Sequence, residues 1–239
     1  MRMVKTTKSI HNIKRIVIFT LAIIFSFKVY ASCNDSDKND DYILNLGGVI
    51  LDLNLPFSSC PITGGVVRGE DKYAKEGGSF YANRGKSKCH FALDLEIYNS
   101  VQTNYGEGQP VYSAGDGVVR LSSKNWGAAG HTIIISHGGN YYSIYSHLKE
   151  LFVSKGVEVK SGGLIGSIGY SGNAKKLKTD NLPPHLHFTV VRSIQPLSNW
   201  KPISVVKEIE QANDTLLFME GFGFINPLSW LSANNCMVR

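Results

Sequence analysis

The sequence predicts a mainly β domain, with an antiparallel β-sheet core and a short helical insertion near the C-terminus. Short runs of apolar residues, or of alternating apolar and polar residues, are separated by Gly, Asn, Asp and Ser. These runs are rich in β-branched and aromatic residues, which favour strands. Turn sequences such as His137-Gly138-Gly139-Asn140 lie between consecutive runs, and short turns join antiparallel neighbours.

The expected strands follow one another along most of the chain. They are Val49–Leu53, Phe91–Ile97, Val111–Ser113, Gly117–Leu121, Thr132–Ser136, Tyr141–Tyr145, Leu164–Ile168 and Leu186–Val191. Apolar residues recur at a convincing helical spacing in Ser204–Met219, which predicts the helix. No internal repeat or low-complexity tract divides the sequence, so a single globular domain is expected.

Composition and charge are those of an ordinary globular protein. The 239-residue chain is 43% hydrophobic and 18% charged, which excludes a disordered, collagen-like or polytopic membrane chain. Its net charge of +6 arises in residues 1–31, which contain six Lys and Arg and no acidic residue. Removing these six from the 25 Lys and Arg leaves 19, equal to the 19 Asp and Glu. No nucleic-acid partner is therefore expected.

Residues 1–31 have the three parts of a secretory signal peptide. A basic segment ends at Arg15, a twelve-residue apolar run (IVIFTLAIIFSF) follows, and Val29-Tyr30-Ala31 offers a cleavage site. The run is too short to span a bilayer comfortably. Cleavage after Ala31 and export, to the periplasm or beyond the cell, are expected, with no stable membrane span afterwards. An uncleaved anchor and a lipoprotein attached through Cys33 are the alternatives, although Tyr30 stands where a lipobox usually has Leu.

Four cysteines follow the leader, and in an oxidising compartment they can form two disulfides. Cys33, Cys60, Cys89 and Cys236 allow three connectivities, among which the sequence does not choose. None has the CxxC spacing of a metal knuckle, so all four are expected to be structural. Residues 32–54, with a polar and acidic start, are expected to be an N-terminal extension, and residues 55–239 the functional domain.

His185-Leu186-His187 is the first of three histidine clusters. Pro183 and Pro184 restrict the preceding backbone to extended conformations, and a strand-like run follows. Residues two apart on a strand share a face, with Cα atoms about 6.6 Å apart. His185 and His187 can therefore serve one site. For this cluster alone, two histidines on a polar sheet face are an equally good interpretation.

The second cluster is the segment from His90 to Asp94, where polar and apolar residues alternate. On a straight strand the Cα atoms of His90 and Asp94 would lie about 13 Å apart, too far for both to bind one ion at about 2 Å. A shared metal therefore requires the chain to bend near His90. Cys89 points away under the same alternation and is excluded as a ligand. An incidental surface His and Asp is the alternative interpretation.

The third cluster is Tyr145-Ser146-His147-Leu148, at the end of an expected strand. A lone histidine there would usually be structural. Taken together, however, the three clusters offer His, Asp and His ligands that leave a fourth zinc position open, and two further histidines that can move protons and stabilise an oxyanion. Zinc lowers the pKa of a bound water toward about 7, so these residues favour amide hydrolysis. No GxSxG, P-loop or HExxH motif competes with this interpretation.

These motifs resemble those of the lysostaphin/LytM-type zinc metalloendopeptidases, which cut peptide bonds in bacterial peptidoglycan. His90–Asp94 is similar to the family's HxxxD motif, His185–His187 to its HxH motif, and Tyr145–Leu148 to the histidine motif between them. The resemblance covers roughly residues 55–192 and a closing segment, Ile225–Leu228. Two departures are that Ala92 replaces a common glycine, and that a longer loop, Asn173–Leu182, precedes the HxH strand.

The resemblance implies a role for each of the five site residues. His90, Asp94 and His187 would bind one Zn2+ per domain, and His147 and His185 would be the catalytic pair. The implied fold is an antiparallel β core with a groove that holds the metal.

The resemblance also implies the activity and its location. Residues 55–239 would be a zinc endopeptidase domain, acting on peptidoglycan peptides outside the cytoplasm. The rival is a non-catalytic envelope protein of this fold that regulates a cell-wall amidase. Such relatives usually lack one of the five residues, and here all five are present. His131 and His137 match no ligand position and are expected to be structural. The sequence does not indicate the oligomeric state or the bond that is cut.

Overall fold

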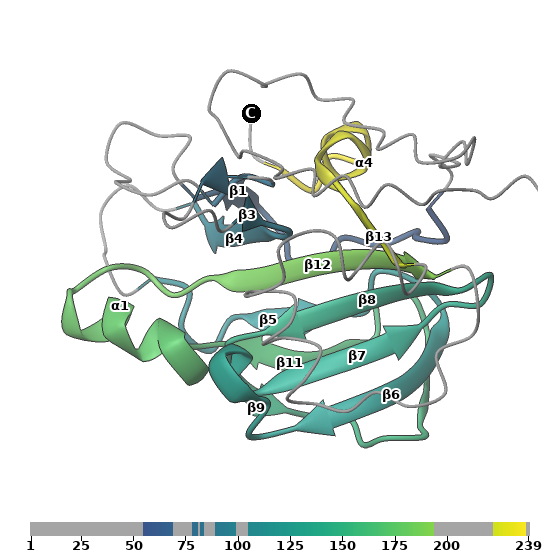
Figure 1. The fold of residues 1–239 in the computed structure, drawn as a ribbon, viewed down its shortest axis with the longest axis horizontal. Coiled ribbons are helices and arrows are strands. Elements are labelled where there is room, and N and C mark those ends of the chain that lie inside the picture. Colours follow the sequence, from purple (N-terminus) through teal and green to yellow (C-terminus); the bar gives the residue numbers. More distant parts are fainter. Residues whose placement is uncertain are drawn as a thin grey trace, which may run out of the picture.

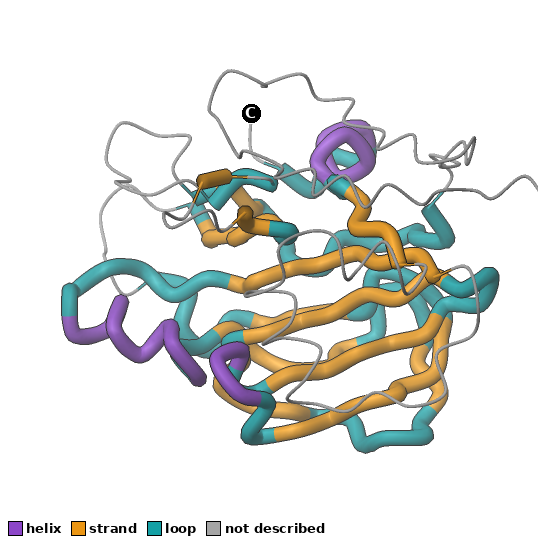
Figure 2. The backbone as a smooth tube through the Cα atoms, viewed as in Figure 1, coloured by secondary structure: helices purple, strands orange, loops and turns teal. Residues whose placement is uncertain are grey.

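A computed structural model describes residues 55–68, 78–80, 82–83, 89–98, 105–193 and 222–237. Within these residues most of the regular structure is β-strand, and the paired strands run antiparallel (Figures 1 and 2). The expectation of a mainly β, antiparallel fold is therefore confirmed. Among the same residues, none of the helices has the length and apolar content needed to cross a bilayer.

The largest sheet has eight strands in the order β1–β4–β12–β8–β7–β6–β10, with β13 also paired to β12. In chain order these strands are β1 (Gly65–Val67), β4 (Leu93–Ile97), β6 (Gly117–Ser123), β7 (Thr132–Ser136), β8 (Tyr141–Ser146), β10 (Glu158–Val159), β12 (Leu186–Ser193) and β13 (Phe222–Ile225). The centre of the sheet is β12, because β8 lies on one side of it and β4 and β13 share the other.

Two smaller sheets complete the β structure. A three-stranded sheet has the order β5–β11–β9 and a two-stranded sheet pairs β2 with β3. Their strands are β2 (Ala82–Asn83), β3 (Cys89–His90), β5 (Pro110–Tyr112), β9 (Leu148–Leu151) and β11 (Leu164–Ile168). The helical segments are short: η1 (Gly127–Ala129), η2 (Gly172–Ala174), α1 (Lys175–Thr179) and α4 (Leu228–Ala233).

The main hydrophobic core lies between the large sheet and the three-stranded sheet, which forms a second layer behind it (Figure 1). Strand β7 shows how the sequence builds this arrangement. Ile133 and Ile135 point into the main core, whereas Ile134 points to the opposite face and packs with Trp126. Because successive side chains on a strand alternate between faces, an unbroken apolar run such as Ile133–Ile135 predicts a strand that is covered on both sides.

Most of the expected strands agree with the structure to within two residues, and Thr132–Ser136 and Leu164–Ile168 have the expected bounds. The strand expected at Phe91–Ile97 begins two residues later, as β4 at Leu93, and the separate short strand β3 before it was not expected. The sequence did not reveal the short strands β1, β2, β9, β10 and β13, which offer too few residues for a readable alternation. The expected strand Val49–Leu53 and helix Ser204–Met219 lie outside the described residues.

The expected loop Asn173–Leu182 is a second correction, since it contains η2 and the one-turn helix α1. Asp180 N donates to Lys176 O, and Leu182 N donates to Leu177 O at 2.8 Å. No Gly or Pro interrupts this stretch, and Lys and Leu are good helix formers. The segment before the HxH strand is therefore partly helical rather than irregular.

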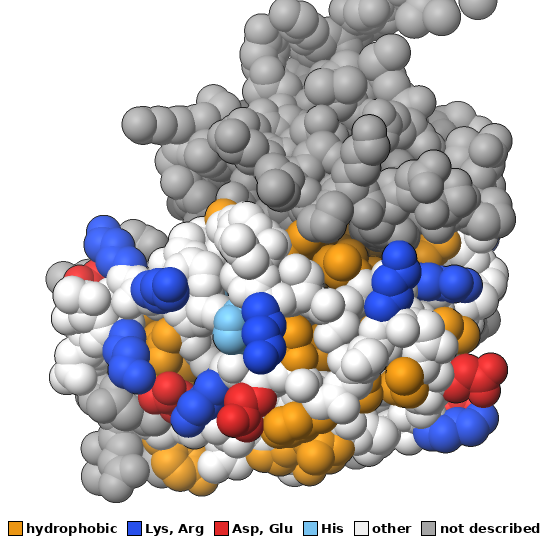
Figure 3. Space-filling model, turned by 90° about the horizontal axis from the view of Figure 1, so that it is seen from below, with side chains coloured by type: hydrophobic (Ala, Val, Ile, Leu, Met, Phe, Trp, Pro, Cys, Tyr) orange, Lys and Arg blue, Asp and Glu red, His pale blue; other side chains and the backbone are white. Residues whose placement is uncertain are grey.

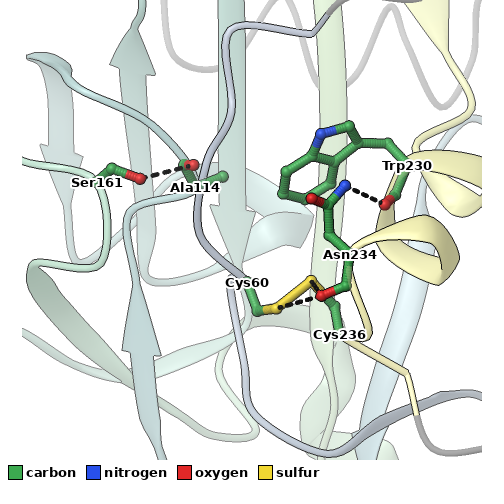
Figure 4. Close-up of a disulfide and its surroundings, with 6 residues drawn as sticks. All are labelled: Cys60, Ala114, Ser161, Trp230, Asn234 and Cys236. Atoms are coloured by element: carbon green, nitrogen blue, oxygen red, sulfur yellow. Dashed lines mark hydrogen bonds between the residues drawn. A yellow bond between two sulfur atoms is a disulfide. The ribbon is translucent and has the colours of Figure 1, made fainter.

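A disulfide between Cys60 and Cys236 fastens the residues after α4 to the start of the described chain (Figure 4). The bridge joins Cα atoms 5.2 Å apart, and Gly65 N donates to Cys236 O nearby at 3.2 Å. This is one of the three expected pairings; Cys33 and the side chain of Cys89 lie outside the described residues. Because β1 pairs with β4, the bridge also braces the strand that carries Asp94.

Candidate metal centre

Strand register brings two of the expected site residues side by side. His187 on β12 lies opposite Asp94 on β4, and on its other side opposite Ser146 at the end of β8. His147 directly follows β8, so three neighbouring strands place their site residues at one end of the sheet (Figure 1). Directly paired residues share a face, so Asp94 and His187 point to the same side. Alternation alone would turn His147 to the other side, but His147 lies beyond the strand and its backbone is left-handed.

His90 reaches Asp94 because the chain breaks between β3 and β4. His90 Nε2 lies 3.2 Å from Asp94 Oδ1, which a straight five-residue strand could not achieve. The bend that a shared metal requires is therefore present at Phe91 and Ala92. Ala92 is fully buried, so the residue that replaces the family's glycine is accommodated there.

Three ligand atoms converge at the spacing of a small metal site. His187 Nδ1 lies 2.9 Å from Asp94 Oδ1 and 3.2 Å from His90 Nε2, and His90 Nε2 lies 3.2 Å from Asp94 Oδ1. Ligand atoms bound to zinc at about 2.0–2.2 Å in tetrahedral geometry lie about 3.4 Å apart. His90, Asp94 and His187 are thus a group that could hold a metal ion, and both the chemistry and the spacing of its donors suit zinc.

The backbone fixes which nitrogen of His90 faces this group. His90 Nδ1 lies 3.0 Å from Ser79 O, and a carbonyl oxygen can only accept, so Nδ1 carries the proton. In the neutral ring Nε2 then presents a lone pair to Asp94 and His187. A carbonyl that orients a histidine in this way is typical of metal sites.

Asp94 is the charged member of the group and is 2% exposed. Burial alone would raise the pKa of its carboxyl, but His185, His90 and His187 outweigh burial and hold the pKa well below its usual value. The carboxylate is therefore ionised at neutral pH and offers a negatively charged oxygen to the group.

His147 and His185 lie against the three donors. Their ring centroids are 5.1 Å apart, and that of His147 is 5.5 Å from that of His187. His185 Nε2 lies 3.4 Å from Asp94 Oδ1. His147, His185 and His187 form a second group able to hold a metal. The two groups share His187, and only the first includes a carboxylate.

His147 has a left-handed backbone, with φ +62°, between β8 and β9. Its N–H donates to Ala129 O, and its ring Nδ1 donates to Ser171 O, both at 3.0 Å. Its Nε2 is consequently the lone-pair nitrogen in the neutral ring. Residues with positive φ are uncommon outside glycine and cluster at functional sites; the sequence did not predict this conformation.

Both of these histidines are neutral in the structure at pH 7. Burial, reinforced by His187, lowers the pKa of His147 to about 3. Burial also lowers the pKa of His185 well below its usual value, against the opposing effect of Asp94. Each neutral ring offers one N–H donor and one lone pair.

Two charged residues at this site were not found by sequence reasoning. Arg68 Nη1 lies 3.4 Å from His185 Nδ1, and Arg68 Nε lies 3.2 Å from Glu96 Oε1. Glu96 could have been recognised from its place two residues after Asp94, on the same face of β4. No spacing in the sequence points to Arg68.

The remaining histidines lie outside both groups. His131 Nδ1 donates to Lys149 O at 2.9 Å. His137 Nδ1 donates to Asp116 O at 2.8 Å, and His137 Nε2 lies 2.6 Å from Ser143 Oγ. These partners belong to the fold, as expected for structural histidines.

Exposed lysines of the described residues pair with acidic side chains rather than forming one positive field. Lys178 Nζ pairs with Glu107 Oε2 at 3.2 Å and lies 5.3 Å from the centre of the Tyr170 ring. Lys160 pairs with Asp116 at 2.9 Å. Figure 3, which views the molecule from below, shows Lys and Arg side chains interspersed with Asp and Glu over the described residues in that view.

The class that the structure defines is an antiparallel β fold with a His/Asp group at the end of its central strands that could hold a metal ion. Residues 96–199 match peptidase family M23. The matched segment includes His147, His185 and His187, while His90 and Asp94 lie just before it. The resemblance to the lysostaphin/LytM-type endopeptidases is confirmed.

Curated relatives and solved structures add detail. The peptidoglycan DD-endopeptidase ShyA of Vibrio cholerae is 36% identical over 94 residues, which are 39% of this chain and 20% of ShyA. The lipoprotein NlpD/LppB homolog of Pseudomonas aeruginosa is 34% identical over 51% of this chain and 38% of its own. The catalytic domain of lysostaphin from Staphylococcus simulans is 21% identical, with 66% and 92% of the two chains covered and a TM-score of 0.43. The chain spans about a fifth of the length of the first Vibrio relatives.

Proposed function

We propose that the protein is an exported zinc metalloendopeptidase that hydrolyses peptide bonds in the cross-links or bridges of peptidoglycan. The observation that carries this proposal is the convergence of His90, Asp94 and His187, with donor atoms 2.9–3.2 Å apart, beside two neutral histidines. Similarity to peptidoglycan DD-endopeptidases supports the choice of substrate. Residues 55–239 would form the catalytic domain, after a signal peptide at 1–31 and an extension at 32–54.

His90, Asp94 and His187 would hold the zinc ion. When bound, zinc would supply a Lewis acid that polarises the substrate carbonyl and lowers the pKa of water. His90 presents Nε2 because Ser79 O accepts from Nδ1, and Asp94 contributes the negative charge. Since the ligands come from three segments, the strand pairing holds them in place before substrate arrives.

His147 and His185 would divide the proton transfers between them. The Nε2 lone pair of His147 accepts a proton from the attacking water, and returns it to the leaving amine when the C–N bond breaks. His185 accepts from Arg68 at Nδ1, so its Nε2–H can donate to the oxygen that becomes negative in the tetrahedral intermediate. One histidine is therefore the base and the other the donor, and the protons balance over one turnover.

The rival function is regulation of a cell-wall amidase by a non-catalytic envelope protein. Similarity to the lipoprotein NlpD/LppB homolog is the observation that supports this rival function, so the experiment must distinguish the two functions. The geometry favours catalysis, because a binding role would not require all five residues to converge on one buried point. Export rests on the sequence of residues 1–31, which lie outside the described residues.

The test is digestion of purified peptidoglycan by residues 32–239, with mass spectrometry of the released muropeptides. Parallel samples contain chelator, chelator followed by zinc, His187→Ala, and His131→Ala as a matched control outside the donor groups. We expect zinc-dependent loss of cross-linked muropeptides that His187→Ala abolishes and His131→Ala retains. A folded, zinc-loaded protein that cuts no wall preparation would contradict the proposal and favour capture of an amidase partner.

A further inference from the structure

Arg68 is a buried cation placed directly behind one of the two histidines of the proposed catalytic pair. Its side chain is 11% exposed and follows β1. Its backbone N–H donates to Asp94 O at 2.9 Å, and its carbonyl accepts from Gly78 N at 2.6 Å. A Cβ at Gly78 would lie 2.7 Å from Arg68 Cβ and 2.8 Å from Asp94 Cβ. The backbone thus holds Arg68 close to the strand that carries Asp94.

The guanidinium of Arg68 contacts two side chains at once. Its Nε lies 3.2 Å from Glu96 Oε1, and its Nη1 lies 3.4 Å from His185 Nδ1. A guanidinium has only donors, so His185 Nδ1 must be the acceptor and must lack a proton. The proton of neutral His185 is then on Nε2, which faces Asp94.

We propose that Arg68 is a positioning residue, held by Glu96, that keeps His185 in the tautomer with its proton on Nε2. This inference rests on the proposed function, since only that tautomer can donate to a developing oxyanion. With the proton on Nδ1, His185 would turn a lone pair toward the substrate oxygen and would repel its negative charge. Arg68 therefore acts through His185 and does not touch the substrate.

The alternative is a purely structural ion pair that joins β1 to β4. Those strands already pair through their backbones, with Val66 opposite Glu96, and a structural pair has no need to contact His185. The two interpretations differ in one measurable property, because a structural ion pair would leave the tautomer of His185 unchanged when it is removed.

The experiment is 15N NMR of the histidine rings in residues 32–239, zinc-loaded and chelator-treated, at a pH where the histidines are neutral. In the unaltered protein we expect His185 with a protonated Nε2 and an unprotonated Nδ1. Glu96→Gln should keep this tautomer, because Arg68 can still donate. The double variant Arg68→Met/Glu96→Gln should shift His185 toward the Nδ1–H form, without leaving a buried carboxylate unpaired. Arg120→Met, at an exposed arginine on β6, is the matched control, and the ring signals of His137 report whether each variant is folded.

Activity gives the second readout. Compared with Glu96→Gln, the double variant should lose about 10–100-fold in kcat, the range typical of residues that orient a site, with KM changed much less. A His185 that carries its proton on Nδ1 in the unaltered protein would overturn the inference without any variant, as would equal tautomer populations in Glu96→Gln and the double variant. Because the tautomer is read without hydrolysis, a protein that shows the expected tautomer but cuts no peptidoglycan would refute the proposed function and leave the role of Arg68 standing.

Discussion

Among the described residues, two polar groups that include histidine lie beside strands of the large sheet, and they differ in what the ring nitrogens face. In the cluster of His137, Ser143 and Tyr145, both nitrogens of His137 meet groups of the fold, Asp116 O and Ser143 Oγ. In the donor group, His90 Nδ1 meets a backbone carbonyl, whereas Nε2 faces His187 and Asp94. In the first group both ring nitrogens of His137 have hydrogen-bond partners in the fold. In the second, ligand atoms of His90, Asp94 and His187 converge.

This difference separates a structural histidine from a candidate ligand. Lone pairs of Asp94, His90 and His187 repel one another unless protons or a cation lie between them, so their convergence within 3.2 Å is the arrangement that a cation could stabilise. Around His137 the hydrogen bonds run on through Ser143 to Tyr145, where burial raises the pKa to about 12. That network holds its protons and needs no ion.

The largest expected effect comes from the charge of the donor group. Asp94→Asn removes the anionic ligand, and we expect peptidoglycan hydrolysis to fall by more than the 10–100-fold typical of residues outside the ligand shell. Asp116→Asn is the matched control, since the Asp116 side chain is exposed and pairs with Lys160. The measurement is the rate of muropeptide release by the two variants, compared at the same zinc occupancy. Equal activity would mean that Asp94 is no ligand.

Zinc should stabilise the fold through the donor group alone. At a free concentration of about 100 Kd, a ligand specific for the folded state adds about 2.7 kcal/mol to the free energy of unfolding. For a protein of this size that corresponds to a rise in Tm of about 5–10 °C. Calorimetry with and without zinc measures this rise in Tm. Asp94→Asn should lose the response and Asp116→Asn should keep it; the reverse pattern would place the ion elsewhere.

Breaking the structural cluster should affect stability and spare catalysis. His137→Ala leaves Ser143 and Asp116 O without a buried partner, which costs about 1–3 kcal/mol. Urea unfolding measures the loss, and kcat/KM of the folded, zinc-loaded variant should stay within about twofold of the unaltered protein. A large drop in kcat/KM would show that the two clusters are coupled.

Per pH unit, the pH dependence of the metal-free protein is the smallest of the expected effects. The pKa of His147 is lowered to about 3 from 6.5, chiefly by burial. Between these values the unfolded chain binds a proton that the folded chain does not, so stability falls as the pH falls through this window, by at most about 1.4 kcal/mol per pH unit for one proton. His147→Asn, which tolerates the positive φ, should have a shallower slope in urea titrations. Identical slopes would mean that His147 is protonated in the folded state.

The sequence predicts features that depend on the periodicity of a strand and on the spacing of residues in a motif. It misses breaks within a strand and contacts between residues far apart in the chain. Short apolar runs located β7 and β11, and period-two alternation placed His185 and His187 on one face. It could not foresee that the strand containing His90 breaks at Phe91 and Ala92, although it showed that a shared metal required such a bend. Arg68 belongs to a segment with no motif, and only the pairing of β1 with β4 brings it behind His185.

The disulfide between Cys60 and Cys236 turns most of the chain into a covalent circle. The two cysteines are 176 positions apart, and all five site residues lie between them. A single cut by another protease inside this circle would open it into a line without releasing a piece. On a gel run without reductant the nicked protein would keep its full mass, and adding a thiol would divide it in two. A chain exposed to proteases would thereby survive one break in its backbone as one molecule.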